Sequence, residues 1–161
     1  MHFLKREDDL KLFEFQVKKM NEFEAKIITS WIHISPYDCY NYPSWKYMSS
    51  QNWFITDEIK RGKIAYSVYK NGNLVGGIYL IKSENDYLLG LDLKPEFCGK
   101  GLGKTILNLS EKILQHEKND LVLKVREFNK RAIKCYLNYG FTIEKKFVEN
   151  NITFYLMRLK R

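Results

Sequence analysis

The sequence predicts a mixed α/β fold, in which a central, mostly antiparallel sheet of about seven strands carries helices on both faces. Three observations support this class. Short segments with alternating apolar and polar residues, typical of half-buried strands, are interspersed with segments of helical periodicity. An Asn-Gly dipeptide at residues 71–72 joins two strand-like segments as a hairpin, and a glycine-rich loop at residues 98–103 joins a strand to a helix. The expected order of elements is βααβββαβαββ.

Length and composition predict one globular domain. The chain has 161 residues, of which 45% are hydrophobic and 15% aromatic. A chain of this size buries enough apolar surface to fold without a metal or a disulfide. No internal repeat, low-complexity tract or linker rich in Gly, Ser or Pro marks a boundary. We therefore expect residues 1–161 to form a single domain.

Hydropathy and cysteine use predict a cytoplasmic protein. Residues 1–13 carry several charges and no apolar stretch of the kind a signal peptide needs, and no run approaches the about 18 apolar residues of a membrane span. Cys39, Cys98 and Cys135 form no CxxC motif and have no His at ligand spacing. We therefore expect a reducing compartment, no disulfide framework, no metal site and no membrane association.

The formal net charge of +8 favours an anionic partner without identifying it. Basic residues extend from Lys5 to Arg161 and are mixed with acidic ones, which is typical of a solvated surface. A dedicated nucleic-acid stripe is disfavoured by this mixing.

The first 60 residues are predicted to hold one strand and two helical segments. Alternation over residues 13–17 predicts a strand. Asn21 is a good N-cap, so a helix is expected from residue 22 to about residue 32. A loop rich in Pro and Tyr follows, and residues 44–60 are expected to be partly helical. The expected apolar face of the first helix is Phe23, Ile27 and Trp31.

The middle of the chain is predicted to form three consecutive strands. The first starts with the alternating residues Ile64, Tyr66 and Val68, and the second covers residues 74–81. The dipeptide at 71–72 is the one that type I′ turns require, because both of its residues adopt positive φ. A second turn at residues 83–86 leads to a central strand over residues 87–93.

The last third is predicted to be helix, strand, helix and two strands. Apolar residues at helical spacing predict a helix that starts near Leu102, and alternation predicts a strand over residues 121–125. Asn129 is expected to cap a short helix that ends at Gly140. Strands over 141–148 and 152–159 are joined by a turn at 149–151. The expected apolar face of the short helix is Ala132, Ile133, Tyr136 and Leu137.

The glycine-rich loop is the strongest functional signal. Glycines between a strand and a helix let the backbone approach a ligand, and the helix N-terminus offers unpaired N–H groups to an anion. A nucleotide P-loop is excluded because Cys98 stands where its first glycine should be, and no later strand ends in a magnesium-binding Asp. The Rossmann motif is excluded because Gly99, Gly101 and Gly103 give GxGxG. A phosphate or pyrophosphate is the predicted ligand, and a tight turn without a ligand is the alternative.

Two motifs in this order resemble those of the GNAT superfamily of acyl-CoA-dependent N-acyltransferases. Cys98-Gly99-Lys100-Gly101-Leu102-Gly103 is similar to the family signature (Q/R)-x-x-G-x-(G/A), with Cys98 in place of Gln or Arg. Asn129, Ala132, Tyr136, Gly140 and Phe141 match the signature Asn-x-x-Ala-x-x-x-Tyr-x-x-x-Gly-Phe. The resemblance covers nearly the whole chain and implies transfer of an acetyl group from acetyl-CoA to an amine.

The resemblance also implies roles for individual residues. It makes Tyr136 the general acid for the leaving thiolate, with core packing as the alternative, and it assigns the oxyanion to a backbone N–H near residues 91–93. Because an alkylamine is protonated at neutral pH, a base is needed, and Asp92, Glu127 or a water chain are the candidates. The residues implied to bind the cofactor are Leu91, Leu93, Cys98, Gly99, Lys100, Gly101, Leu102, Gly103, Lys104 and Asn129.

The acceptor and its binding site are less well defined by the sequence. The family places its acceptor wall near the first helix and its loop, where Trp31, Tyr37, Tyr40, Tyr42 and Trp45 gather. These aromatics either enclose an amine or only pack in the core. A small-molecule or peptide amine is expected, while its identity, the oligomeric state and a strict preference for acetyl stay open. The alternative function is a non-catalytic acyl-CoA sensor or nucleic-acid-binding module of the same fold.

Overall fold

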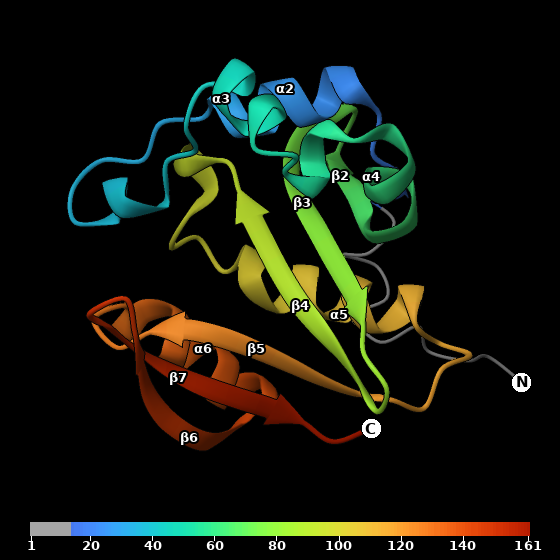
Figure 1. The fold of residues 1–161 in the computed structure, drawn as a ribbon. Helices are drawn as coiled ribbons and strands as arrows, with labels where there is room; N and C mark the ends of the chain where they lie inside the picture. The colour runs from blue at the N-terminus through green and yellow to red at the C-terminus, as the bar shows by residue number, and fades with distance from the viewer. Residues whose placement is uncertain (1–13) are drawn as a thin grey trace, which may run out of the picture. The chain divides into compact units, whose positions relative to one another are not determined.

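The computed structural model describes residues 14–161, and within them seven strands form one sheet in the order β1-β2-β3-β4-β5-β7-β6 (Figure 1). The strand β4 pairs with β5 in parallel. The strand β2 pairs with β1 and β3 in antiparallel fashion, and β7 pairs with β5 and β6 in the same way. This confirms the mixed fold with a mostly antiparallel sheet. The elements are β1 (Phe15–Lys19), α2 (Glu22–Ser30), η1 (Tyr37–Tyr40), α3 (Trp45–Ser50), η2 (Phe54–Thr56), α4 (Glu58–Ile64), β2 (Ala65–Lys70), β3 (Asn73–Lys82), β4 (Asp86–Leu93), η3 (Pro95–Phe97), α5 (Leu102–Ile113), β5 (Asp120–Arg126), α6 (Lys130–Tyr139), β6 (Thr142–Glu149) and β7 (Ile152–Leu159).

The chain divides into two compact units, and β3 and β4 contribute residues to both. Within the described residues, unit 1 comprises residues 14–79 together with Leu91–Cys98. Unit 2 comprises Leu80–Gly90 and Gly99–Arg161. The first expected strand lies in unit 1 and is shifted toward the C-terminus, since β1 begins at Phe15; Phe13 and the segment before it lie outside the described residues.

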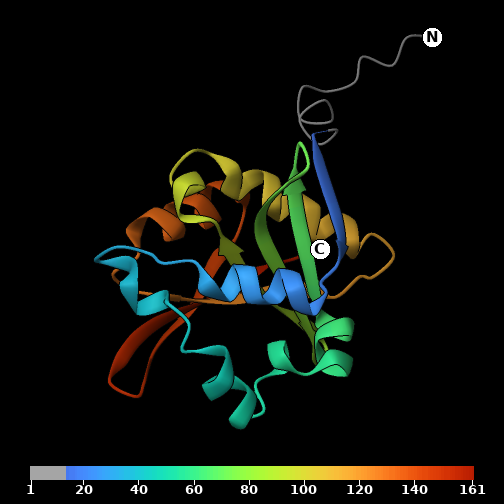
Figure 2. The same cartoon turned by 90° about the horizontal axis from the view of Figure 1, so that it is seen from above.

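The helix α2 begins as expected but buries a different face. The Asn21 side chain accepts the Glu24 N–H, and the Glu24 carboxylate accepts the Asn21 N–H, which makes a complete capping box. The predicted face was wrong, because Phe23 is 74% exposed while Ala25 and Ile28 are buried. Trp31 lies beyond the last helical turn, so it could not define a helical stripe. Figure 2 shows α2 and the blue strand β1, which pairs with β2.

The segment 44–60 forms two short helices rather than one, so three helices lie between β1 and β2 where two were expected. Each helix has its own side-chain cap: Ser44 accepts the Tyr47 N–H before α3, and Asp57 accepts the Lys60 N–H before α4. The helix α4 also includes Ile64, which was expected to begin a strand. The strand β2 therefore starts at Ala65, where the backbone becomes extended.

The two predicted turns of the middle segment are confirmed. Asn71 and Gly72 have φ of 48° and 79°, the positive values of a type I′ turn. The Ser83 N–H donates to the Asp86 carbonyl at 2.9 Å, closing the second turn. A register shift between Val68 and Tyr69 interrupts β2, so its buried residues do not follow the simple alternation expected.

The core of unit 1 forms where these helices meet the strands. Its buried cluster comes from α2, α3, η2 and the strands β2 and β3, and partly buried aromatics pack against it. The cluster consists of Met20, Ala25, Ile28, Met48, Ile55, Ala65 and Tyr79.

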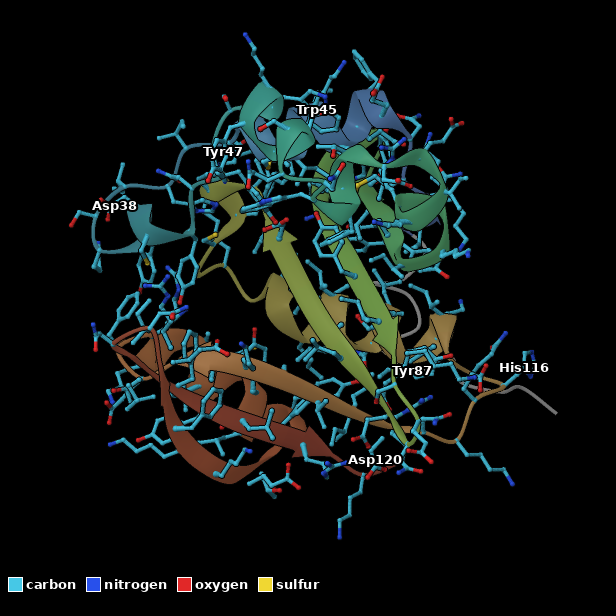
Figure 3. All side chains as sticks on the ribbon, in the orientation of Figure 1. Asp38, Trp45, Tyr47, Tyr87, His116 and Asp120 are labelled. Carbon is cyan, nitrogen blue, oxygen red and sulfur yellow. The ribbon has the colours of Figure 1, made fainter. Side chains whose placement is uncertain are left out.

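Unit 2 is built from α5, α6 and the strands β5, β7 and β6. The strand β5 pairs with β4 through Leu88 and Val122, and with β7 through Leu123 and Met157. Figure 1 shows α6 behind β5 and β7 in this view. Figure 3 labels Asp120 at the start of β5. The buried residues of this core include Ile106, Leu107, Leu109, Leu121, Leu123, Val125, Ile133, Phe141 and Met157.

The helix α6 ends as predicted but buries less than predicted. Gly140 has φ of +127°, and the Phe141 N–H donates to the Tyr136 carbonyl at 3.0 Å, which closes the helix. Ile133 and Phe141 are buried, whereas Leu137 is 46% exposed and was wrongly placed on the apolar face. In the next turn, Asn150 and Asn151 both have positive φ, as a tight connection between β6 and β7 requires.

The described residues contain no helix long and apolar enough to cross a membrane. Cys39, Cys98 and Cys135 form no disulfide bond within the described residues. Over residues 14–161, no group of three or more His, Cys, Asp or Glu side chains is arranged to hold a metal ion.

Candidate functional site

The glycine loop of unit 2 leads into the N-terminus of α5, and its backbone adopts a conformation that favours glycine. Gly99 and Gly101 have φ of 74° and 78°, in the left-handed region. Gly101 is the N-cap of α5, and no side chain caps this helix. The N–H groups of the first turn are therefore not capped by a side chain, which is the arrangement that anion-binding helix N-termini use.

Gly103 has a second role that the motif alone did not reveal. A Cβ placed on Gly103 would lie 2.6 Å from the Cys135 Sγ of α6, well inside van der Waals contact. The absence of a side chain thus allows α5 and α6 to pack closely. A Cβ on Gly101 would meet no atom within 4 Å, so Gly101 is constrained by its φ value and not by packing.

Arg131 of α6 reaches back over the loop. A Cβ on Gly99 would lie 3.2 Å from Arg131 Nη1, so the guanidinium and the first loop glycine are neighbours. Lys100 and Lys104 are exposed near the same helix N-terminus. The loop thus combines an uncapped helix N-terminus with nearby cations, and both features suit a phosphate-bearing ligand.

Cys98 ends the segment of unit 1 that leads into the loop. Its Sγ lies 3.7 Å from the carbonyl oxygens of Leu93 and Lys94, as a weak thiol donor. The Cys98 N–H donates to the Pro95 carbonyl at 3.1 Å. Leu91 and Leu93 flank Asp92 on β4, so their side chains point away from the face that Asp92 takes.

The second motif forms the α6 helix of unit 2. Asn129 Oδ1 accepts the Ala132 N–H at 3.1 Å, which confirms its role as N-cap. Tyr136 is half-buried, and its ring centroid lies 5.8 Å from that of Phe141. The ring is thus held by packing on Phe141, which is compatible with either role expected for Tyr136.

Asp92 is held by two phenols in unit 1. The hydroxyls of Tyr42 and Tyr79 both donate to Asp92 Oδ2, each at 2.7 Å. Burial raises the pKa of Asp92 above its usual range, while the two hydrogen bonds and the influence of His33 act in the opposite direction. A carboxylate whose pKa is raised toward neutrality is a stronger base than an ordinary one.

Glu127, the other candidate base, lies in a different environment in unit 2. Lys146 Nζ lies 2.5 Å from its Oε1, and the Tyr155 hydroxyl donates to the same oxygen at 3.3 Å. The hydrogen bond from Lys146 lowers the pKa of Glu127, which weakens it as a base. This geometry suits an ion pair between strands better than proton abstraction.

The expected acceptor wall is divided between core and surface. Trp31, Tyr42 and Trp45 are partly buried and pack against the core of unit 1. Lys26 Nζ lies 5.3 Å from the centroid of the Trp45 ring. Tyr37 and Tyr40 lie on η1 and are half-buried. Figure 3 labels Asp38 on η1, together with Trp45 and Tyr47 on α3.

Sequence reasoning missed three residues at these sites. Arg131 and Cys135 face the loop from α6, and a helical spacing of four residues was the available signal, since it places both on one side of the helix. Tyr79 was read only as part of an apolar strand. The turn at 83–86 joins the strands that hold Tyr79 and Asp92, and this hairpin was the signal that the two lie close.

One comparison with known proteins identifies a family. A sequence model of the acetyltransferase (GNAT) family matches residues 26–141. A comparison with curated protein sequences finds no match.

Several solved structures share the fold. A GNAT-family acetyltransferase from Bacillus anthracis has a TM-score of 0.73 and 15% identity, covering 91% of this chain and 95% of its own. A mutant spermidine N-acetyltransferase from Vibrio cholerae has a TM-score of 0.68 and 18% identity, with coverage of 91% and 94%. The ribosomal-protein-S18-alanine N-acetyltransferase from Escherichia coli has a TM-score of 0.65 and 17% identity, with coverage of 90% and 92%.

These identities establish a common fold and no shared substrate. The family model, however, spans more than half of the chain and includes both the glycine loop and the Asn129 motif. The chain belongs to the acetyltransferase (GNAT) family.

Proposed function

We propose that this protein transfers an acetyl group from acetyl-CoA to a primary amine by direct attack, without a metal or a covalent enzyme intermediate. The observation that carries the proposal is the glycine loop, whose left-handed residues lead into an α5 N-terminus without a side-chain cap. A helix N-terminus without a side-chain cap suits the pyrophosphate of a CoA thioester.

The charge of unit 2 supports this choice of co-substrate. Unit 2 holds 15 Lys and Arg against 8 Asp and Glu, whereas the described residues of unit 1 hold 9 against 8. CoA carries several phosphate charges, so a positive unit attracts it and accelerates its association. We assign the pyrophosphate to the backbone of residues 99–104 and a supporting charge to Arg131, with Asn129 as a further contact.

The chemistry requires a proton acceptor and a proton donor. The amine loses a proton as its nitrogen bonds to the thioester carbonyl carbon, and the resulting oxyanion accepts a backbone N–H from residues 91–93. The C–S bond then breaks, and the CoA thiolate takes a proton from the Tyr136 hydroxyl. Free CoA and an N-acetylamine are the products.

We propose Asp92 as the proton acceptor in preference to Glu127. Burial raises the pKa of Asp92, while the ion pair with Lys146 lowers the pKa of Glu127. A general base works best when its pKa approaches the operating pH. The raised pKa favours Asp92 over Glu127 as the proton acceptor, either directly or through one water molecule.

The acceptor is proposed to be an amine that contacts Trp31, Tyr37, Tyr40 or Trp45. Aromatic faces attract cationic amines, and an ammonium group also suits the carboxylate of Asp92. Spermidine and alanine, the amines named for two structural neighbours, are sensible first members of an acceptor panel.

The test is thiol release from acetyl-CoA across that panel, with an amine-free control. Release of CoA only when an amine is present supports the transferase. A rise in melting temperature with acetyl-CoA, but no turnover with any amine, would instead indicate an acyl-CoA sensor. A larger rise with MgATP than with acetyl-CoA would remove CoA as the ligand.

Two wider proposals accompany this function. We propose that both units belong to one acyltransferase domain, since a single family model covers parts of both. We also propose a cytoplasmic location, which suits three free thiols and acetyl-CoA chemistry.

A further inference from the structure

The carboxylate of Asp92 accepts hydrogen bonds from two tyrosines that are distant from it in the sequence. Both hydrogen bonds that it receives within residues 14–161 end on Oδ2, one from Tyr42 and one from Tyr79. Two donors on one oxygen restrict the orientation of the carboxylate and leave Oδ1 to accept a further hydrogen bond. The arrangement is therefore asymmetric, with one oxygen anchored and the other available.

Both phenols are themselves held by packing. Tyr79 is 5% exposed, belongs to the buried cluster of unit 1 and meets the Phe54 ring edge-on at 5.5 Å. Tyr42 meets the Trp53 ring edge-on at 6.4 Å. The two hydroxyls thus reach Asp92 from a strand and from a loop whose rings have little freedom to turn.

Gly77 provides the space for the Tyr79 hydroxyl. A Cβ on Gly77 would lie 2.8 Å from Tyr79 Oη and 3.1 Å from Met20 Cε. Any larger residue at position 77 would displace this hydroxyl from its place beside Asp92. The strand therefore carries a glycine where the phenol lies against its backbone.

We propose that Tyr42 and Tyr79 are positioning residues, which orient the Asp92 carboxylate and stabilise its ionised form so that Oδ1 accepts the proton of the amine. This inference rests on the proposed function, because it assumes that Asp92 acts as the base. It adds an explanation of how the partly enclosed Asp92 carboxylate keeps its charge and its orientation. The Tyr42 contact also links the acceptor loop to the base.

The charged and titratable groups around Asp92 determine in which direction its pKa changes when a tyrosine hydroxyl is removed. The groups that act on it are Tyr79, Tyr42 and His33, and each lowers the pKa that burial raises. Burial, followed by the charge of Asp92, raises the pKa of Tyr42 and of Tyr79, so both phenols keep the protons that they donate. Removal of either hydroxyl therefore raises the pKa of Asp92 and delays its ionisation to higher pH.

The experiment compares Tyr42→Phe, Tyr79→Phe and the double variant with wild type. Each variant keeps its ring and loses one donor, so the acid limb of kcat/KM should move to higher pH by about one unit per hydroxyl. The ¹³C shift of the Asp92 carboxyl, followed by NMR against pH, should move by a similar amount without any need for turnover. Gly77→Ala should shift both readouts in the same direction as Tyr79→Phe.

Tyr69→Phe is the matched control. It also removes a phenol donor to a buried carboxylate of unit 1, since the Tyr69 hydroxyl donates to Glu24 at 2.6 Å. Its acid limb and its Asp92 titration should equal those of wild type. A shift as large as that of Tyr79→Phe would show that the effect is not specific to Asp92.

The outcomes separate this inference from the proposed function. If Asp92→Asn abolishes turnover but the Phe variants lose only thermal stability, with unchanged acid limb and NMR titration, the two phenols are simple tethers and the inference is overturned. If the NMR titration moves as expected while Asp92→Asn retains the wild-type pH profile, the phenols do control the carboxylate, and the assignment of Asp92 as base fails.

Discussion

The glycine loop of unit 2 and the Asp92 cluster of unit 1 differ in the charge that they present and in the groups that present it. The loop presents backbone N–H groups and lies among exposed cations, including Lys100 and Lys104. The Asp92 cluster holds one partly enclosed carboxylate between two phenols. The first suits a highly charged ligand that arrives from solvent, and the second suits a single proton transfer away from bulk water.

The glycine loop and the Asp92 cluster are therefore expected to be sensitive to different kinds of substitution. Backbone recognition depends on φ values and on close packing, so it is sensitive to any side chain at Gly101 or Gly103. Side-chain recognition depends on single donors, so it is sensitive to the loss of one hydroxyl. The predictions below test each kind, starting with the largest effect.

The largest effect is expected for Tyr136→Phe. If Tyr136 donates the proton to the leaving thiolate, kcat should fall by roughly 10²-fold, the usual scale for a general acid. The ring contact with Phe141 is retained, so the melting temperature and acetyl-CoA affinity should barely change. Steady-state kinetics on the best amine provides the measurement.

Tyr139→Phe is the control for that result. Tyr139 also packs near Phe141, but its hydroxyl donates to Asn108 and Glu111. Its loss should reduce stability and leave kcat within about twofold. Wild-type turnover in the Tyr136 variant would return Tyr136 to a packing role.

Gly103→Ala should destabilise the fold by about 2 kcal/mol through overpacking. The new methyl group would meet Cys135 Sγ, which the glycine now accommodates at 2.6 Å from the Cβ position. Cys135→Ala removes that sulfur, so the double variant should recover most of the loss in denaturant unfolding. If the stability losses of Gly103→Ala and Cys135→Ala simply add in the double variant, the two residues do not contact each other in this way.

Gly101→Val should weaken acetyl-CoA binding by about tenfold, because a β-branched residue disfavours the left-handed φ of 78° that the loop requires. No atom lies within 4 Å of its Cβ position, so the fold should lose less stability than with Gly103→Ala. Calorimetric titration with acetyl-CoA measures the affinity. Unchanged affinity would exclude the loop from the co-substrate site.

The smallest effect concerns the other buried carboxylate of unit 1. Burial alone raises the pKa of Glu24, but hydrogen bonds from Tyr69 and the Asn21 N–H, with the charge of Lys18, outweigh it and lower the pKa. A lowered pKa adds stability above the ordinary value of 4.5, and this is lost as the pH falls through the folded value. Glu24→Gln should therefore cost about 1 kcal/mol at pH 7 and nearly nothing at pH 3.

Unfolding curves at the two pH values provide this measurement. Glu58→Gln is a useful control, since Glu58 is an exposed first-turn glutamate of α4. An equal loss at both pH values in the Glu24 variant would indicate that the shape of the side chain matters and its charge does not.

Features that depend on a few adjacent residues could be predicted from the sequence. Asn21, Asn129, Gly140 and the Asn71-Gly72 turn were correctly predicted, because caps and turns depend on a few adjacent residues. The succession of the seven strands along the chain was also predicted from local patterns. Residues 44–60 were expected to be partly helical, but their division into two short helices was not predicted, because each helix depends on its own cap rather than on a long apolar period.

Contacts between side chains that are far apart in the chain depend on the tertiary fold and could not be predicted. The buried face of α2 depends on the strands it packs against, so Phe23 is exposed despite its helical spacing. Asp92 and Glu127 are both carboxylates near strand ends, yet two phenols surround one and an ammonium group pairs with the other. Hydrogen bonds and burial between residues far apart in the chain set the proton affinity of each carboxylate, and a linear sequence does not contain those distances.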